Sequence, residues 1–173
     1  MLNQFKRLVR HCWLSQSASQ PTRRSALTER VTQLVTASEG NHTGEIRIYI
    51  ETGLPLNYLL GEDSTPELAH KRALSVFGNL RVWDTENNNG VLIYLLLAER
   101  HIELIADRGL NSLVCPQEWS CLISKMCNAF QRGDYETGLV QALSEVSALL
   151  ITHFPLGAGQ RHLNELPNAP VVG

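Results

Sequence analysis

Apolar and polar positions follow two different periods along this chain, and the periods predict its elements. Apolar residues recur three or four positions apart, as on one face of a helix, around residues 27–40, 66–80, 116–130 and 135–150. Residues 45–51 alternate strictly, which predicts a strand with one strongly buried face. The continuous apolar run 91–97 predicts a central strand covered on both sides, and 102–106 predicts a third strand.

The order of these segments predicts the topology. The first two strands flank a helix, so they should be parallel with a right-handed crossover. The third strand should return antiparallel after a short turn at Glu99 and Arg100. Helices then cover both faces of the sheet. The expected fold class is α/β: one domain, built as a three-layer α/β/α sandwich with a small mixed central sheet.

Start and stop signals set the boundaries. Thr65 can cap the second helix, with Pro66 at its first position, and Asp134 can cap the last helix after a stop at Gly133. The expected organisation is an N-terminal amphipathic segment and linker over 1–24, an α/β/α domain over 25–154 and an extended tail over 155–173. Within the first part, residues 1–14 suit a short basic amphipathic helix and residues 15–25 suit a loop.

Composition narrows the class of protein. The chain has 173 residues, of which 18% are charged and 43% apolar, and its net charge is -2. These values are typical of a soluble domain and give no general attraction to nucleic acid. The longest apolar run, Val91–Ala98, is too short for a membrane helix, and no signal peptide is visible, so a cytoplasmic location is expected. Residues 1–14 could contact a membrane surface or a partner, although docking on their own domain is the favoured interpretation.

The cysteines and histidines offer little chemistry. Cys12, Cys115, Cys121 and Cys127 contain no C-x-x-C pair, so we expect reduced, buried, structural thiols. The six histidines show no H-E-x-x-H spacing, and no P-loop, dinucleotide fingerprint or G-x-S-x-G elbow is present. His42 could serve as an acid or base, or be a solvated loop histidine.

The strand directions bring polar residues together. The starts of the first two strands and the end of the third should meet, which places Glu45, Gly90 and Asp107 on one rim of the sheet. Asp84, Glu86 and Asn87–Asn89 lie in the loop above it. Carboxylate and amide oxygens suit a hard cation such as calcium or magnesium. The spacing is not that of an EF-hand, because Gly90 falls at the seventh position from Asp84 and Leu95 at the twelfth. An alternative is that Asp84 and the asparagines cap turns and that Asp107 pairs with Arg108 or Arg81.

Several short motifs resemble one family. They are Gly44-Glu45-Ile46, Trp83 with Asn88-Asn89-Gly90-Val91-Leu92-Ile93, Ala106-Asp107-Arg108-Gly109, and Phe130-Gln131-Arg132-Gly133-Asp134-Tyr135 with Gly138-Leu139. Together they resemble a TPM domain, over about residues 25–152. Asn164-Glu165-Leu166-Pro167 and the run from Arg81 to Glu86 resemble a short, stand-alone bacterial branch of that family.

The resemblance implies an α/β/α sandwich and two kinds of function. Family members include acid phosphatases and calcium binders, and some act in photosystem II repair or modulate a membrane receptor. By motif position, the resemblance puts forward Asp84, Glu86 and Asp107 as metal or phosphate-site residues. The first hypothesis is therefore a divalent-metal-dependent phosphatase for phosphate esters. Asp84, Glu86, Asp107 and Glu45 would hold the metal, and Asp107 and Arg108 would be catalytic. The alternative is a non-catalytic, calcium-binding accessory domain with a protein partner in a membrane complex.

Overall fold

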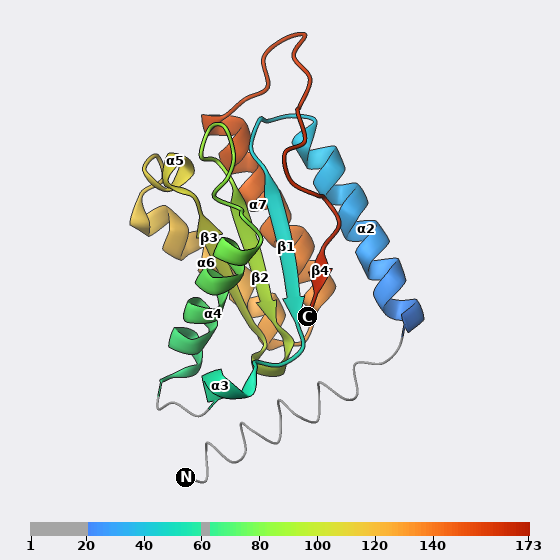
Figure 1. Cartoon of the computed structure of the whole chain (residues 1–173), viewed down its shortest axis with the longest axis vertical. Coiled ribbons are helices and arrows are strands. Elements are labelled where there is room, and N and C mark those ends of the chain that lie inside the picture. The colour runs from blue at the N-terminus through green and yellow to red at the C-terminus, as the bar shows by residue number, and fades with distance from the viewer. Residues whose placement is uncertain (1–20, 60–62) are drawn as a thin grey trace.

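The computed structural model describes residues 21–59 and 63–173, and Figure 1 shows how its elements are layered. The helices are α2 (Pro21–Glu39), α3 (Leu56–Leu59), α4 (Thr65–Asn79), α5 (Arg108–Asn111), α6 (Pro116–Gln131) and α7 (Tyr135–His153). The strands are β1 (Ile46–Glu51), β2 (Val91–Leu96), β3 (His101–Ala106) and β4 (Val171–Val172), with a 3-10 turn over Leu97–Glu99. The predicted segment 1–14 lies outside the described residues. Residues 21–25, predicted as a loop, instead begin α2, because proline is tolerated in a first helical turn.

The sheet has four strands in the order β3-β2-β1-β4. β1 runs parallel to β2, with Ile46 opposite Val91, and β2 runs antiparallel to β3, with Val91 opposite Ala106. These directions confirm the predicted topology. β4 pairs with β1 in parallel and was not predicted. Helices lie on both sides of the sheet, so the expected α/β/α class is confirmed (Figure 1).

The two faces of the sheet carry separate cores. On one face α2, α6 and α7 cover the isoleucines and valines of the strands, with Val35, Met126, Phe130 and Val146 among the residues they bury. On the other face α4 covers a second core, which includes Leu68, Ala73, Val76, Leu92, Tyr94, Leu96 and Leu166. Apolar residues on both sides of β2 explain its uninterrupted apolar run.

The strict alternation in β1 does not mark a solvent-facing side. Arg47 and Glu51, at polar positions of that strand, are 5% and 3% exposed. Glu51 accepts two-pronged hydrogen bonds from Arg72 of α4 and one from the Tyr94 hydroxyl at 2.6 Å. Arg47 donates to the Ala169 carbonyl at 3.0 Å. Both faces of β1 are therefore buried, and its polar side chains are buried with partners.

The helix ends follow the predicted signals with one correction. Ser64, not Thr65, is the N-cap of α4, and the Glu67 carboxylate accepts a hydrogen bond from the Ser64 N–H at 2.8 Å. Gly133, with φ of +79°, follows α6, and Asp134 caps α7 by accepting from the Thr137 N–H at 3.2 Å. The turn before β3 closes without a glycine, and Arg100 takes the left-handed conformation there, with φ of 49°.

The C-terminal tail (residues 155–173) packs along the domain instead of leaving it (Figure 1). It starts beside the loop after α2, where the Leu156 N–H donates to the Asn41 carbonyl at 3.2 Å. It ends as β4, where the Gly173 N–H donates to the Ile50 carbonyl at 3.0 Å. The tail thus runs the length of β1 and covers its outer edge.

The described part of the chain bears on two predictions, one about membrane helices and one about cysteines. No helix there has the length and apolar composition needed to cross a membrane. Cys115, Cys121 and Cys127 are free thiols, as expected, but Cys115 and Cys121 are exposed and only Cys127 is half-buried. The prediction of buried cysteines was therefore wrong for two of these three, because Cys115 lies at the exposed N-cap of α6 and Cys121 on the solvent-facing side of that helix.

Candidate metal site

The starts of β1 and β2 and the end of β3 meet at one rim of the sheet. The Val91 N–H donates to the Glu45 carbonyl and the Asp107 N–H donates to the Gly90 carbonyl, both at 2.8 Å. The loop before β2 and the first half of the tail lie at this same end of the molecule (Figure 1). Polar groups from four parts of the chain are thereby placed at one rim.

Glu39, Glu45 and His162 form a cluster at this rim. Each offers one ligand atom, and the three atoms lie within 4.8 Å of one another. Among residues 21–59 and 63–173, this is the one cluster of three or more histidine, cysteine, aspartate or glutamate side chains whose ligand atoms lie close enough together to hold a metal ion. The His162 Nε2 lies 3.1 Å from the Glu45 Oε1 and 3.9 Å from the Glu39 Oε2. Glu39 and Glu45 are 2% and 0% exposed. This cluster could hold a metal ion.

Backbone hydrogen bonds fix the cluster in place. The Glu45 carboxylate accepts from the Glu165 N–H at 2.9 Å and from the Leu166 N–H at 3.2 Å. The His162 Nδ1 lies 3.1 Å from the His42 carbonyl oxygen. Because a carbonyl only accepts, Nδ1 must carry a proton, and in the neutral ring Nε2 then presents a lone pair. A backbone carbonyl that holds Nδ1–H in this way is the usual support of a histidine that binds metal through Nε2.

The Nε2 atom of His162 has no hydrogen-bond partner, although it is buried beside two carboxylates. Its 3.1 Å separation from Glu45 is a short contact, but the atoms are not aligned as a hydrogen bond. A lone pair facing carboxylate oxygens is repulsive unless a proton or a cation lies between them. The arrangement of donors therefore suits a positive ion.

The pKa values reflect the cost of burying these groups. Burial, and then the neighbouring Glu45, raises the pKa of Glu39 to about 7. Burial also raises the pKa of Glu45, against the opposing effect of the Glu165 N–H. Burial lowers the pKa of His42 to about 4, so this loop histidine is neutral and buried rather than solvated. A cation in the cluster would relieve the repulsion between the two carboxylates.

Asp107 and Asn89 add two further buried oxygens to the rim. Asp107 accepts from the Arg108 N–H through Oδ1 at 2.7 Å, and its Oδ2 has no hydrogen-bond partner. Asn89 donates to the Thr43 carbonyl at 3.2 Å, and its Oδ1 also has no partner. Each of these two oxygens is a buried hydrogen-bond acceptor without a donor, and a bound cation or a protonated group would satisfy it. Gly109 lets the two loops meet, because a Cβ there would lie 2.4 Å from the Asn88 carbonyl oxygen.

The residues predicted as a site are only partly brought together. Glu45 lies in the cluster, and Asp107 lies buried at the same rim. Asp84 is exposed and pairs with Arg81 at 2.9 Å, whereas the alternative interpretation had Asp84 capping a turn and offered Arg81 as a partner of Asp107. Glu86 is exposed, and its N–H donates to the Glu165 carboxylate at 3.0 Å. Arg108 is exposed and donates from Nε to the Asn88 Oδ1 at 2.9 Å, so Asp107 contacts its backbone and not its guanidinium.

Two of the three cluster residues, Glu39 and His162, were not foreseen. Glu39 had one signal in the sequence, because a carboxylate at a helix C-terminus opposes the helix dipole and needs another reason to be there. His162 had none, since it lies in a segment with no periodic pattern.

A pocket of about 490 Å³ opens beside the cluster and is here called the rim pocket. Its lining residues are Thr43, Glu86, Asn87, Leu156, Gln160, Arg161, His162, Leu163 and Glu165. His162 is the member of the cluster that lines it. The rim pocket therefore connects the buried cluster with a space large enough for a small ligand.

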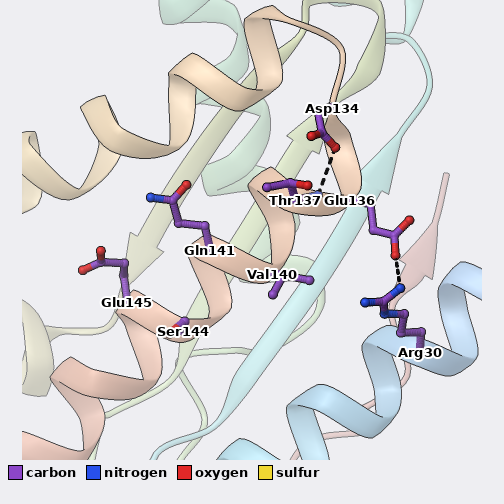
Figure 2. Close-up of a pocket in the computed structure, with 8 residues that line it drawn as sticks. All are labelled: Arg30, Asp134, Glu136, Thr137, Val140, Gln141, Ser144 and Glu145. Atoms are coloured by element: carbon purple, nitrogen blue, oxygen red, sulfur yellow. Dashed lines mark hydrogen bonds and ion pairs between the residues drawn. The ribbon is translucent and has the colours of Figure 1, made fainter.

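A second pocket of about 520 Å³ lies between α2 and α7 (Figure 2). Its charged residues are already engaged, because Arg30 pairs with Glu136, Asp134 caps α7 and Glu145 pairs with Lys125. The rim pocket, with unpartnered atoms beside it, is the better candidate site.

Comparison with known proteins agrees with this architecture. A family model described as the TPM domain matches residues 24–149. The chain belongs to the TPM domain family. The TPM match ends before the tail, so His162 lies outside the matched region and Glu39 and Glu45 lie inside it. No curated protein matches the chain.

A solved structure shares the TPM fold of this chain. It is the NMR structure of the BA42 protein from the psychrophilic bacterium Bizionia argentinensis, with a TM-score of 0.71 and 26% sequence identity. The similarity covers 86% of this chain and 94% of that one. The α/β/α arrangement is thus shared along nearly the whole of the BA42 chain.

Proposed function

We propose that this TPM domain is a divalent-metal-dependent phosphatase that acts on phosphate esters in the rim pocket. The observation that carries the proposal is the Glu39–Glu45–His162 cluster, in which a buried, unpartnered Nε2 faces two buried carboxylates. Three protein ligands leave a coordination position open, as in catalytic metal sites. His162 joins the cluster to the rim pocket, where that open position would meet a substrate.

The donor set indicates which metals to test first. The oxygens of the loop before β2 suggested calcium or magnesium, but a set with one imidazole nitrogen and two carboxylates suits manganese, iron or zinc better. Asp107 and Asn89 offer oxygen atoms only, so calcium or magnesium would be expected to prefer that part of the rim.

The side chains around the rim pocket have distinct roles in this proposal. A bound divalent ion would supply a Lewis acid and lower the pKa of a water molecule. Arg161 would hold the phosphate and offset the charge that develops on it. Asp107 would accept a proton or a cation at the rim through its unpartnered Oδ2. Arg108, which anchors the loop through Asn88, would add positive charge near the same place.

A metal titration combined with an activity assay tests the proposal. We expect Mn²⁺ or Zn²⁺ to bind by calorimetry with one site that is lost in His162→Ala and Glu45→Gln. We expect hydrolysis of p-nitrophenyl phosphate to depend on that metal and to fall at least about 10-fold in the same variants, since even the loss of a residue that supports a metal ligand typically costs about 10- to 100-fold. Glu118→Gln, on the exposed start of α6, is the matched control. Turnover that persists in His162→Ala, or that does not respond to chelation, would contradict the proposal.

A second candidate function rests on how the tail contacts the cluster. Because Glu45 accepts hydrogen bonds from two backbone N–H groups of the tail, an ion here would also fasten the tail to the domain. We therefore keep a non-catalytic, metal-binding accessory domain as the alternative. Metal binding without hydrolysis of any phosphate ester, together with capture of a specific protein partner, would favour it.

A further inference from the structure

The rim pocket carries charges of both signs. Arg161 and His162 line it, and so do the acidic residues Glu86 and Glu165. Leu156 and Leu163 contribute apolar surface, and Leu163 is 77% exposed. A site built only for a phosphate group has no need of two carboxylates in its wall, because they repel the substrate.

Glu165 is held firmly beside the metal cluster. Its N–H donates to the Glu45 Oε1 at 2.9 Å, and its carboxylate accepts from the Glu86 N–H at 3.0 Å. These bonds tie the tail to the loop before β2 and put the two carboxylate-bearing residues on neighbouring backbone. The Glu165 carboxylate keeps acceptor positions that its hydrogen bond to Glu86 does not use.

The charges around the rim pocket indicate which phosphate esters it would bind best. Glu39 and Glu45 together offset the charge of a divalent ion. Among the residues that line the rim pocket, Arg161 is then the one arginine or lysine to balance Glu86, Glu165 and the incoming phosphate. A polyanionic ester such as a nucleotide would add to an excess of negative charge. An ester that carries an ammonium group would neutralise it, with the ammonium beside Glu86 and Glu165 and the phosphate beside Arg161 and His162.

We propose that the rim pocket selects small phosphomonoesters that carry an ammonium group. This inference rests on the proposed function and names its substrate class. In the reaction, the oxygen of water forms a bond to phosphorus and the P–O bond to the alkyl oxygen breaks. The alkyl oxygen takes a proton and leaves as an amino alcohol, and inorganic phosphate is the second product.

Two nearly isosteric esters test the inference. Phosphoethanolamine and propyl phosphate have tails of similar length and differ in the ammonium group. With the Mn²⁺-loaded protein we expect kcat/KM for phosphoethanolamine to exceed that for propyl phosphate about tenfold, since ion pairs at a partly exposed site contribute modestly. In the double variant Glu86→Gln/Glu165→Gln this ratio should fall close to one. Glutamine at position 165 can still accept the hydrogen bond from Glu86, so the loop contact is kept.

The outcomes separate the inference from the function on which it rests. Hydrolysis of both esters with a ratio below about two, or a ratio that the double variant leaves unchanged, overturns the inference and leaves the phosphatase proposal standing. Absence of hydrolysis of any ester overturns the phosphatase proposal. In that case the ratio of dissociation constants for the two esters, measured by calorimetry on the same protein, decides the ligand class, and equal affinities overturn it. Glu118→Gln again serves as the control.

Discussion

Glu39 and His42 are buried ionisable residues whose pKa values move in opposite senses. The pKa of Glu39 rises from 4.5 to about 7, so between those values the folded state binds more protons than the unfolded state and stability falls as pH rises. The pKa of His42 falls from 6.5 to about 4, so between those values the folded state binds fewer protons and stability rises with pH. Where the two ranges overlap, from about pH 4.5 to 6.5, the effects oppose each other.

Glu39→Gln should therefore reveal the contribution of His42. In the presence of a chelator, the free energy of unfolding of the variant should rise from pH 4 to 6.5 by up to about 1.4 kcal/mol per pH unit. In the unsubstituted protein the raised pKa values of both Glu39 and Glu45 oppose the effect of His42, so its stability should rise less than that of the variant over this range and should fall towards pH 7. Urea unfolding at a series of pH values measures both profiles. If the variant and the unsubstituted protein showed the same dependence of unfolding free energy on pH, the raised pKa of Glu39 would be contradicted.

At the scale of single residues, the sequence predicted part of the site. Glu45 and Asp107 could be placed at one rim because strand direction alone determines which ends meet. Glu39 and His162 could not, because their proximity depends on a tail that returns to Glu45 over a separation of 120 residues. No local pattern in a single sequence encodes such a contact. The burial of His42 has the same cause, since the tail contacts it at His162 and Pro155.

At the scale of elements, α4 is joined to the sheet by a buried ion pair. Arg72 and Glu51 have side chains that are 16% and 4% exposed, and the Tyr94 hydroxyl completes the carboxylate's partners. Arg72 also lies over the rings of Tyr49 and Tyr58. Glu51, through its hydrogen bonds and charge, raises the pKa of Arg72, so the guanidinium is charged at any relevant pH.

Arg72→Ala should destabilise the domain by about 3–5 kcal/mol, because it leaves a buried carboxylate without its cation. Tyr94→Phe should cost less, about 1.5–3 kcal/mol, since it removes one hydrogen bond to a charged group. The exposed pair of Lys71 and Asp63 offers the matched control, and Lys71→Ala should change stability by less than about 1 kcal/mol. Urea unfolding of the three variants measures these differences. Similar losses for Arg72→Ala and Lys71→Ala would contradict the assigned role.

The elements that were predicted correctly are those whose pattern is local. β1, β2, β3, α4, α6 and α7 each have enough residues for an apolar period or run to show. α3, α5 and β4 have four, four and two residues, which is too short for a period. β4 exists because the tail reaches the free edge of β1, and only the packed tertiary structure determines that.

At the scale of the whole molecule, a metal ion should stabilise the fold through the tail. An ion that binds only the folded state adds about 2.7 kcal/mol at 100 times its Kd. For a domain of this size that corresponds to a rise in Tm of roughly 5–10 °C. Removal of residues 162–173 should abolish the rise and lower the starting Tm, because Glu45 loses its backbone donors and Arg47 loses its acceptor. Differential scanning calorimetry with and without Mn²⁺ measures both effects.

Val172→Ala is the control for this truncation, because it shortens a partly exposed side chain of β4, which pairs with the end of β1 opposite to the cluster. Its Tm should still respond to Mn²⁺. An equal response in the truncated chain would mean that the ion binds elsewhere, with the Asp107 and Asn89 oxygens as the first place to look.

The long separation between Glu45 and the tail also has a kinetic consequence. Contacts across 120 residues close a large loop, so they are expected to form after the more local pairing of β2 with β3. Leu166→Ala, which removes a buried tail side chain, should then accelerate unfolding and leave the refolding rate nearly unchanged. Stopped-flow measurements across a range of urea concentrations separate the two rates, and a comparable slowing of refolding would place the tail in the transition state. The tail would thus determine how long each folded molecule persists, and the rest of the domain how quickly it forms.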